Sequence, residues 1–188
     1  MKKLIIALAA GVLAVGANAA SVSWGAQKGY LYDGDATDPQ KVTSGTAYLV
    51  LTSYAQSDLV SAFAASDAAT TLAGLQGNAG YLGSATIGSN ARISEGTGTT
   101  SATSAIDAYF VVFNGDKMYI SDVATSEYDN LTSEHGINFA SMSTSSKAFN
   151  DVAGGYAGAG WYGAVPEPTS GFLLLLGMAG LALKRKRA

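Results

Sequence analysis

The sequence predicts a mainly β domain: an antiparallel sheet or, as the favoured layout, a β-sandwich, with one helix packed on it. Two segments, residues 46–54 and 105–123, carry the apolar, aromatic and β-branched residues that form strands. One other segment, residues 57–75, gathers its apolar residues on one helical face. We expect a single domain over residues 20–164, and its strand patterns argue against a flexible low-complexity chain.

Strands are expected to open the domain. Residues 21–24 and 29–32 are short candidates, and residues 46–54 (TAYLVLTSY) form a stronger one because they are rich in aromatic and β-branched side chains. Further on, residues 81–87 and 91–94 are strand candidates. Residues 95–104 are almost entirely Gly, Ser and Thr, which predicts a mobile loop.

One helix is predicted over residues 57–75. Ser57 can cap its N-terminus, and the Asp58 carboxylate in the first turn suits the helix dipole. Its apolar face consists of Leu59, Val60, Phe63, Ala64, Leu72 and Leu75.

A hairpin is the clearest predicted element. Residues 105–113 (AIDAYFVVF) and 117–123 (KMYISDV) alternate like strands, and Asn114-Gly115 between them is typical of a type I′ turn. We expect this hairpin to be central to the core. Residues 124–164 are less regular and end in either an edge strand or a flexible spacer.

The charge of the domain excludes some partners. Only 13% of the residues are charged, about half of the ~25% that is usual. Between Ala20 and Val165 there are five basic and 13 acidic residues, a net charge of −8, so we expect no nucleic-acid partner. The chain has no cysteine, which excludes disulfides, thiolate metal sites and cysteine nucleophiles.

Three closely spaced carboxylates are weak metal candidates. Asp33, Asp35 and Asp38 could offer calcium the oxygen ligands it prefers. An EF-hand loop would need Gly where Asp38 stands and Glu where Ser44 stands, so a solvated acidic turn is the favoured interpretation. We therefore expect no cofactor, with calcium as the alternative.

Nothing in the sequence indicates an enzyme. His135 is the only histidine, and we expect it in a surface turn with Glu134 and Gly136. No Gly-x-Ser-x-Gly elbow is present, and one histidine cannot form a zinc cluster. Several aromatic side chains could stack on sugars, although packing in a core or at a sheet edge is favoured: Tyr30, Tyr32, Tyr156, Trp161 and Tyr162.

Residues 1–19 have the three parts of a secretory signal peptide. Two lysines precede an apolar stretch at residues 4–15, and Ala17 and Ala19 supply the small-x-small pattern that signal peptidase recognises. Twelve helical residues span only ~18 Å of a ~30 Å hydrocarbon core. Cleavage after Ala19 is therefore favoured over an uncleaved membrane anchor.

The last segment, residues 165–188, has another three-part pattern. Pro166-Glu167-Pro168 precedes a short apolar stretch at residues 172–183, which we interpret as a short transmembrane segment. The tail that follows should stay in the cytoplasm because it is basic: Lys184, Arg185, Lys186 and Arg187. An ordinary tail anchor is the alternative.

This tail resembles the PEP-CTERM protein-sorting signal. The resemblance implies that exosortase, a membrane-embedded protease, recognises Pro166, Glu167 and Pro168 and removes the tail. It also implies a bacterium with an outer membrane and an association with exopolysaccharide and biofilm. The same signal occurs on unrelated domains, so it does not indicate what residues 20–164 do.

We therefore expect a non-enzymatic envelope or extracellular matrix protein associated with exopolysaccharide. A carbohydrate-binding or adhesin module, with or without calcium, is the first alternative, and a hydrolase is less favoured. The expected partners are signal peptidase, an exosortase-like protease and, transiently, the inner membrane. The protein would pass through a form tethered to that membrane on its way to the cell surface or matrix.

Overall fold

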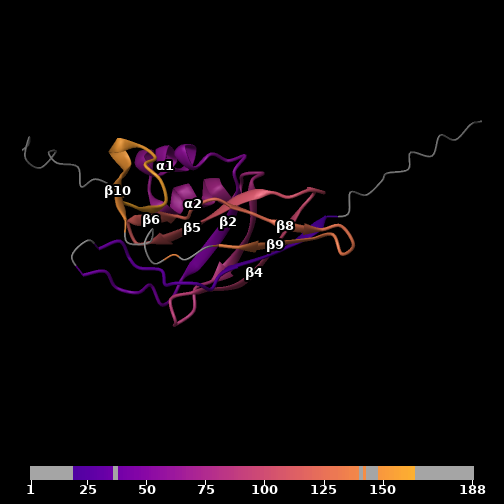
Figure 1. The fold of residues 1–188 in the computed structure, drawn as a ribbon. Helices are drawn as coiled ribbons and strands as arrows, with labels where there is room; N and C mark the ends of the chain where they lie inside the picture. Colours follow the sequence, from indigo (N-terminus) through magenta and orange to yellow (C-terminus); the bar gives the residue numbers. More distant parts are fainter. Residues whose placement is uncertain (1–18, 36–37, 140–141, 143–147, 164–188) are drawn as a thin grey trace, which may run out of the picture.

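The structure is a computed structural model that describes residues 19–35, 38–139, 142 and 148–163 (Figure 1). It is mainly β, which confirms the predicted fold class. The strands are β1 Ala20–Ala26, β2 Thr46–Leu51, β3 Tyr81–Thr86, β4 Ile93–Thr100, β5 Asp107–Asn114, β6 Lys117–Ile120, β7 Ala124–Thr125, β8 Glu127–Asp129, β9 Glu134–Asn138, β10 Phe149–Asp151 and β11 Gly160–Gly163. The helices are α1 Gln56–Ala65, α2 Ala68–Gln76 and the short 3-10 helix η2 Val152–Gly154.

All described strands belong to one mixed sheet. Its order is β10-β11-β6-β5-β2-β3-β4-β1-β9-β8, with β7 paired to β5. The described pairings are antiparallel, except that β1 with β9 and β10 with β11 are parallel. The sheet was predicted to be antiparallel, and it differs because the first strand of the chain inserts between β4 and β9.

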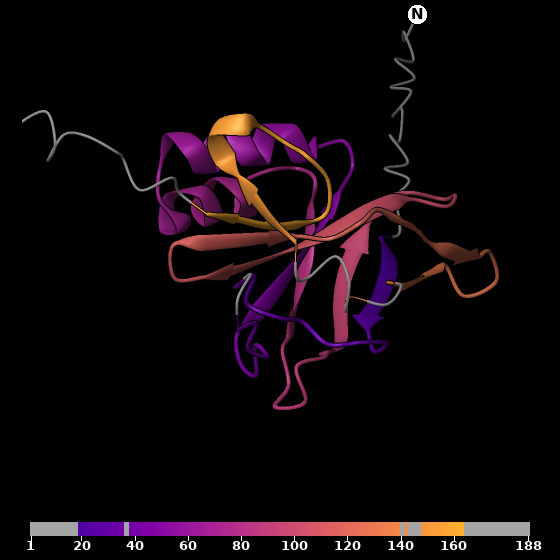
Figure 2. The ribbon, with the colours of Figure 1, turned by 60° about the vertical axis from the view of Figure 1, so that its left-hand side comes forward.

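The sheet curls back on itself. Residues 117–129 run first beside β5, as β6 and β7, and then beside β9, as β8. This one segment therefore links β5 to β9, which lie far apart in the strand order, and Figure 2 shows the resulting curl. The favoured β-sandwich does not form in the described residues, because a single sheet encloses the core that two sheets would otherwise share.

An inner core fills the curled sheet. The ring of Phe110 lies at its centre, with centroid distances of 4.9 Å to Phe139 and 5.6 Å to Tyr119. Burying one such side chain stabilises the fold by ~1.5–3 kcal/mol. Other members of this core are Val22, Trp24, Leu31, Leu49, Ile93, Val112, Ile137 and Trp161.

An outer core lies between the sheet and the helices. Both views show α1 and α2 over the part of the sheet that contains β2, β5 and β6 (Figures 1 and 2). Strand β5 is buried on both faces, because Phe110 points into the inner core while Tyr109 packs under the helices. The outer core also contains Val50, Leu59, Val60, Phe63, Leu75, Val111, Met118, Ile120 and Tyr162.

The predicted helix is divided into two. Ser66 is extended with φ −147°, and the Asp67 carboxylate accepts a hydrogen bond from Thr70 N at 2.7 Å, so that Asp67 caps α2. Ser and Asp favour such breaks because their side chains compete for backbone hydrogen bonds. The predicted cap at Ser57 is also wrong, since α1 begins at Gln56.

The predicted hairpin is confirmed, and the predicted loop is not. Strands β5 and β6 meet at Gly115 and Asp116, because Asn114 still pairs with Lys117. The predicted type I′ turn at Asn114-Gly115 is wrong, since of the two turn residues only Gly115 has a positive φ, 62°. Residues 95–100, predicted as a mobile loop, belong to β4. Their glycines serve close packing, because a Cβ on Gly98 would overlap the carbonyl oxygen of Leu82.

The last described strand is internal. Strand β11 lies between β10 and β6 and buries Trp161 and Tyr162, so both the edge-strand and the spacer predictions are wrong for residues 160–163. Among the described residues, neither helix has the length and apolar character to cross a membrane. The predicted signal peptide, apart from Ala19, and the predicted transmembrane segment lie outside those residues.

Candidate functional site

The two predicted processing regions adjoin the folded domain directly. Ala17, the Pro166-Glu167-Pro168 motif and the basic tail at 184–187 lie outside the described residues. Ala19 is exposed, and Ala20 begins β1 with only 2% exposure. Strand β11 ends at Gly163, just before the predicted sorting tail.

The acidic loop uses its carboxylates to hold its own backbone. Asp33 Oδ1 accepts hydrogen bonds from Asp35 N at 3.0 Å and Gln40 N at 3.1 Å. Asp35 Oδ1 accepts one from Asp38 N at 3.1 Å. No group of three or more acidic or histidine side chains in the described part of the chain is arranged to hold a metal ion.

The aromatic candidates for sugar stacking are mostly engaged. Trp161 and Tyr162 are fully buried, and the Trp161 indole N–H donates to the carbonyl oxygen of Tyr32. The Lys41 ammonium lies 3.6 Å from the centre of the Tyr30 ring. Tyr156 is 37% exposed, and its hydroxyl donates to Gln56 Oε1 at 2.7 Å.

His135 is buried, which makes the predicted surface turn wrong. It lies in β9, and its ring packs against Tyr128 at a centroid distance of 4.6 Å. The ring nitrogens face Ser126 Oγ at 3.1 Å and the Ala102 carbonyl oxygen at 3.1 Å.

One tautomer satisfies this whole network. Nε2 must donate to the Ala102 carbonyl, which has no proton to give. Ser126 Oγ accepts from Ile106 N at 2.9 Å and can donate its own proton to Nδ1 of His135. His135 therefore joins β9 to Ser126 and to residues 102–106, and its buried position keeps it from contacting a bound molecule.

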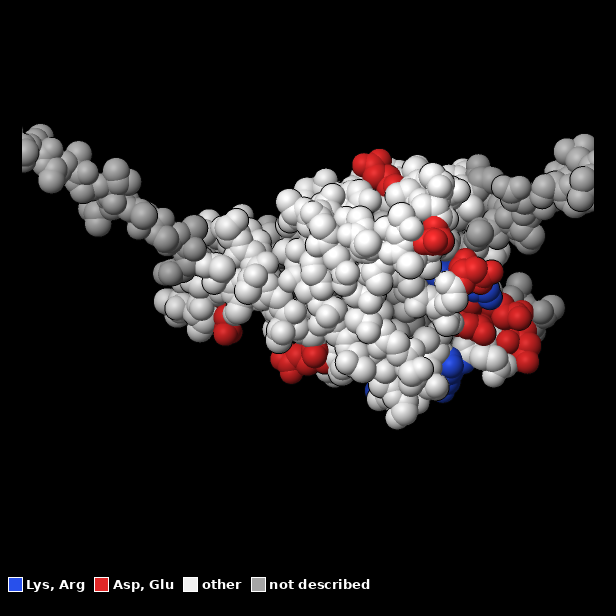
Figure 3. All heavy atoms as spheres, turned by 180° about the vertical axis from the view of Figure 1, so that it is seen from behind, with Lys and Arg blue, Asp and Glu red and all other residues white. Residues whose placement is uncertain are grey.

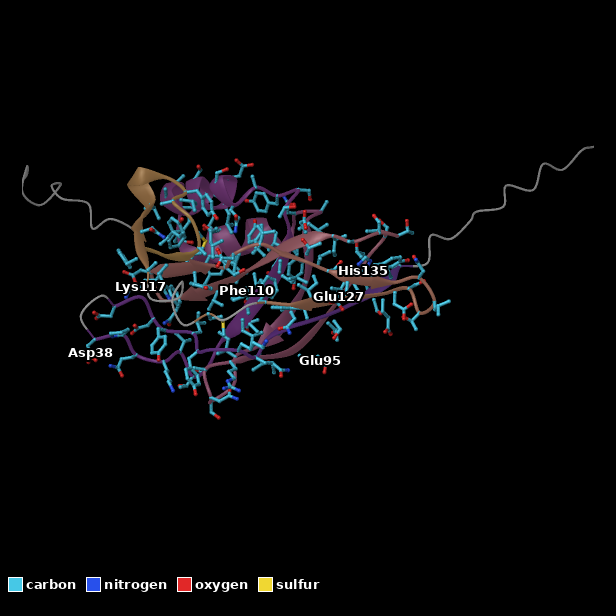
Figure 4. All side chains as sticks on the ribbon, in the orientation of Figure 1. Asp38, Glu95, Phe110, Lys117, Glu127 and His135 are labelled. Atoms are coloured by element: carbon cyan, nitrogen blue, oxygen red, sulfur yellow. The ribbon has the colours of Figure 1, made fainter. Side chains whose placement is uncertain are left out.

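A polar groove crosses the outer face of the sheet. It has a volume of about 770 Å³ and is formed mainly by β1, β4, β8 and β9, with Thr125 from β7. Glu95 lies on β4 and Glu127 on β8, so they border opposite sides of β1 and β9 in the strand order, and Figure 4 labels both. The other side chains at its surface include Ser23, Gln27, Lys28, Thr125 and Asn138.

Several of these polar groups are free to meet a ligand, whereas both hydroxyls donate within the fold. Thr125 Oγ1 donates to Asp107 Oδ1. Ser23 Oγ donates to Glu95 Oε1 at 2.9 Å, which fixes one side of the groove. Within the described residues, no hydrogen bond or ion pair engages the side chains of Gln27, Glu127 or Asn138.

The surface around the domain carries little positive charge. Figure 3 shows a back face that is largely uncharged at its centre, with acidic side chains clustered at the right-hand edge beside a few basic ones and others scattered at the top and lower left. This distribution agrees with the excess of acidic residues in the sequence.

A family model for the PEP-CTERM protein-sorting motif matches residues 164–187. The chain carries a PEP-CTERM sorting signal. The resemblance seen in the sequence is thereby confirmed, and the motif marks an exported protein that is sorted at the membrane and processed by exosortase, a membrane protease. No curated protein and no solved structure is significantly similar to the chain.

The PEP-CTERM signal follows β11 without a long connection, and the sequence indicated it directly. The groove was missed, because its walls come from strands that are far apart in the chain. A usable signal was the glycine within each of two strands, Gly25 in β1 and Gly136 in β9, since glycine inside a strand often marks a close approach.

Proposed function

We propose that this protein is a non-enzymatic component of the envelope or extracellular matrix of a bacterium with an outer membrane. The PEP-CTERM signal, attached directly after the last strand of a folded β domain, is the observation that carries the proposal. Sorting delivers the domain to the cell surface or matrix, where it associates with exopolysaccharide.

The described domain supports a structural rather than a catalytic role. The single histidine of the chain is buried and holds strands together. The acidic net charge keeps such a domain soluble and disfavours binding to anionic surfaces.

A carbohydrate-binding or adhesin module is the second candidate. The polar groove favours it, because its side chains offer both donors and acceptors of hydrogen bonds. The two candidates are compatible, since a matrix protein that binds polysaccharide would be retained in the matrix.

Cell fractionation tests the proposal. An epitope tag fits at the exposed hairpin turn after Gly115, because β1 begins too close to the mature N-terminus and the tail is removed. We expect the tag in the extracellular fraction. Replacing Pro166, Glu167 and Pro168 by alanine should leave the tagged protein in the inner membrane with a larger mass.

A matched control replaces three exposed residues of α1, Ser57, Asp58 and Ser61, by alanine, and it should be sorted normally. The proposal is wrong if the tail-altered protein reaches the medium as efficiently as the control.

A further inference from the structure

The floor of the groove contains two glycines, whose missing side chains leave it open. Gly25 in β1 and Gly136 in β9 lie on neighbouring paired strands, with Ser23 opposite Gly136 and Gly25 opposite Asn138. Neither has a positive φ. A Cβ on Gly136 would meet no atom within 4 Å, and one on Gly25 would be at an ordinary 3.5 Å from its nearest neighbour.

Other glycines of the same sheet contrast with these two. A Cβ on Gly83 or Gly98 would overlap the backbone of the facing strand, and one on Gly96 would overlap the Trp24 indole. Packing explains those three positions. Gly25 lies where the register of β1 shifts against β4, a common place for glycine in a strand. At Gly136, where a side chain would meet no atom, the missing side chain keeps the groove open, which is what a closely approaching ligand needs.

The walls of the groove suit a ligand covered with hydroxyl groups. Trp24 and Ile137 adjoin the groove, but their side chains are buried in the inner core. The accessible side chains are amides, hydroxyls, carboxylates and one ammonium, so recognition would rest on hydrogen bonds rather than on apolar contact.

The shape of the groove suits a chain rather than a small molecule. Gln27 and Glu95 also line a neighbouring hollow of about 390 Å³, and Glu127 and Gly136 also line another of about 690 Å³. The three hollows therefore adjoin one another across β4, β1, β9 and β8, and together they are called the track.

The charge of the track selects among polysaccharides. Carboxylates outnumber cations along the track. Its cations are Lys28 and Arg92, and its carboxylates are Glu95, Glu127, Asp129 and Glu134. An anionic polymer would be repelled, whereas neutral hydroxyls or the ammonium groups of amino sugars would find acceptors.

We propose that this track binds a hydroxyl-rich polysaccharide chain that carries no acidic groups, either neutral or bearing amino groups. The proposal rests on the proposed function, because it names the matrix component that the exported domain contacts.

Calorimetric titration of the full-length protein in mild detergent tests the assignment. Three probes are used: a neutral glucan, chitosan oligosaccharides and polygalacturonate. We expect binding of the glucan or chitosan and none of polygalacturonate. Gly136→Tyr should fill the floor and weaken that binding by about tenfold or more.

Gly74→Tyr is the matched control, because a Cβ at this exposed position in α2 also meets no atom within 4 Å. It should leave the affinity unchanged. Circular dichroism should show both variants folded, because a side chain at either position enters open space. Glu127→Gln provides a second test without added bulk, and it should weaken the binding of chitosan more than the binding of glucan.

Three results would overturn the assignment: no binding of the glucan or chitosan, equal binding of polygalacturonate, or unchanged affinity in folded Gly136→Tyr. None of these results concerns sorting. If the protein still reaches the matrix, they contradict the polysaccharide assignment and leave the proposed function standing. Retention of the mature domain at the inner membrane would instead contradict the proposed function.

Discussion

His135 shows how one residue can tie several segments together. Replacing His135 by Leu buries a side chain of similar volume but leaves the Ser126 hydroxyl and the Ala102 carbonyl without their hydrogen-bond partner. Because a buried polar group without a partner is costly, we expect a loss of ~1–3 kcal/mol in the free energy of unfolding, measured in urea.

The neighbouring change Glu134→Gln affects an exposed side chain and should alter stability by no more than ~0.5 kcal/mol. Equal stability of His135→Leu and Glu134→Gln would show that the network does not hold the strands.

Asp67 gives the fold a dependence on pH. The hydrogen bond from the Thr70 backbone lowers the pKa of the Asp67 carboxyl below its ordinary value. A lowered folded pKa stabilises the protein above the unfolded value, and this stabilisation is lost as the pH falls through the folded value.

Asp67→Ala should therefore lower the melting temperature at pH 7, because it removes the cap of α2. The difference from the unaltered protein should shrink as the pH falls below 3.8. Thermal unfolding followed by circular dichroism measures it, and a difference that is constant with pH would argue against a charged cap.

The sequence contained a local signal for the burial of His135. His135 and Ile137 alternate with exposed residues in β9, and that period of two could have predicted a buried histidine. The polar neighbours of His135 suggested a turn instead. No local signal could have indicated Ser126 or Ala102 as partners, because tertiary packing brings them there.

Strands β3 and β4 depend on glycine where they face each other. Gly98→Ala would force its Cβ against the Leu82 carbonyl, so we expect a loss of ~1–3 kcal/mol in the free energy of unfolding. Gly136→Ala has open space and should be nearly neutral. If urea unfolding gave both variants the same stability, the close approach of β3 and β4 would be in doubt.

The elements with strong local patterns were predictable. The β5–β6 hairpin and β2 have apolar alternation and turn residues that act locally. Only the start of β4 was predicted, within residues 91–94. The rest was missed because its glycines are typical of loops and only the facing strand explains them. The parallel pairing of β1 with β9 joins segments with no sequence signal in common.

The C-terminal strand completes both cores. Trp161 belongs to the inner core and Tyr162 to the outer one. A chain that ends after Gly158 loses both, and since truncating one buried large aromatic residue costs ~3–5 kcal/mol, we expect it not to fold. A chain that ends after Gly163 keeps all described strands and should fold.

Soluble yield and circular dichroism of the two truncated chains distinguish these outcomes. A folded protein ending at Gly158 would mean that β11 is dispensable, and tail removal could then fall inside the domain.

For the whole molecule, the sequence predicts how the protein is sorted better than it predicts what the folded domain binds. The sorting signal is local and contiguous, so its residues could be read directly. The groove is assembled from β1, β4, β8 and β9, and only the folded sheet brings its walls together.

The intact mass of the protein recovered outside the cell tests the central claim most directly. The account predicts a chain that begins at Ala20, retains β11 through Gly163, and lacks the apolar segment and the basic tail. Recovery of a single species that still carries residues 169–188 would contradict it.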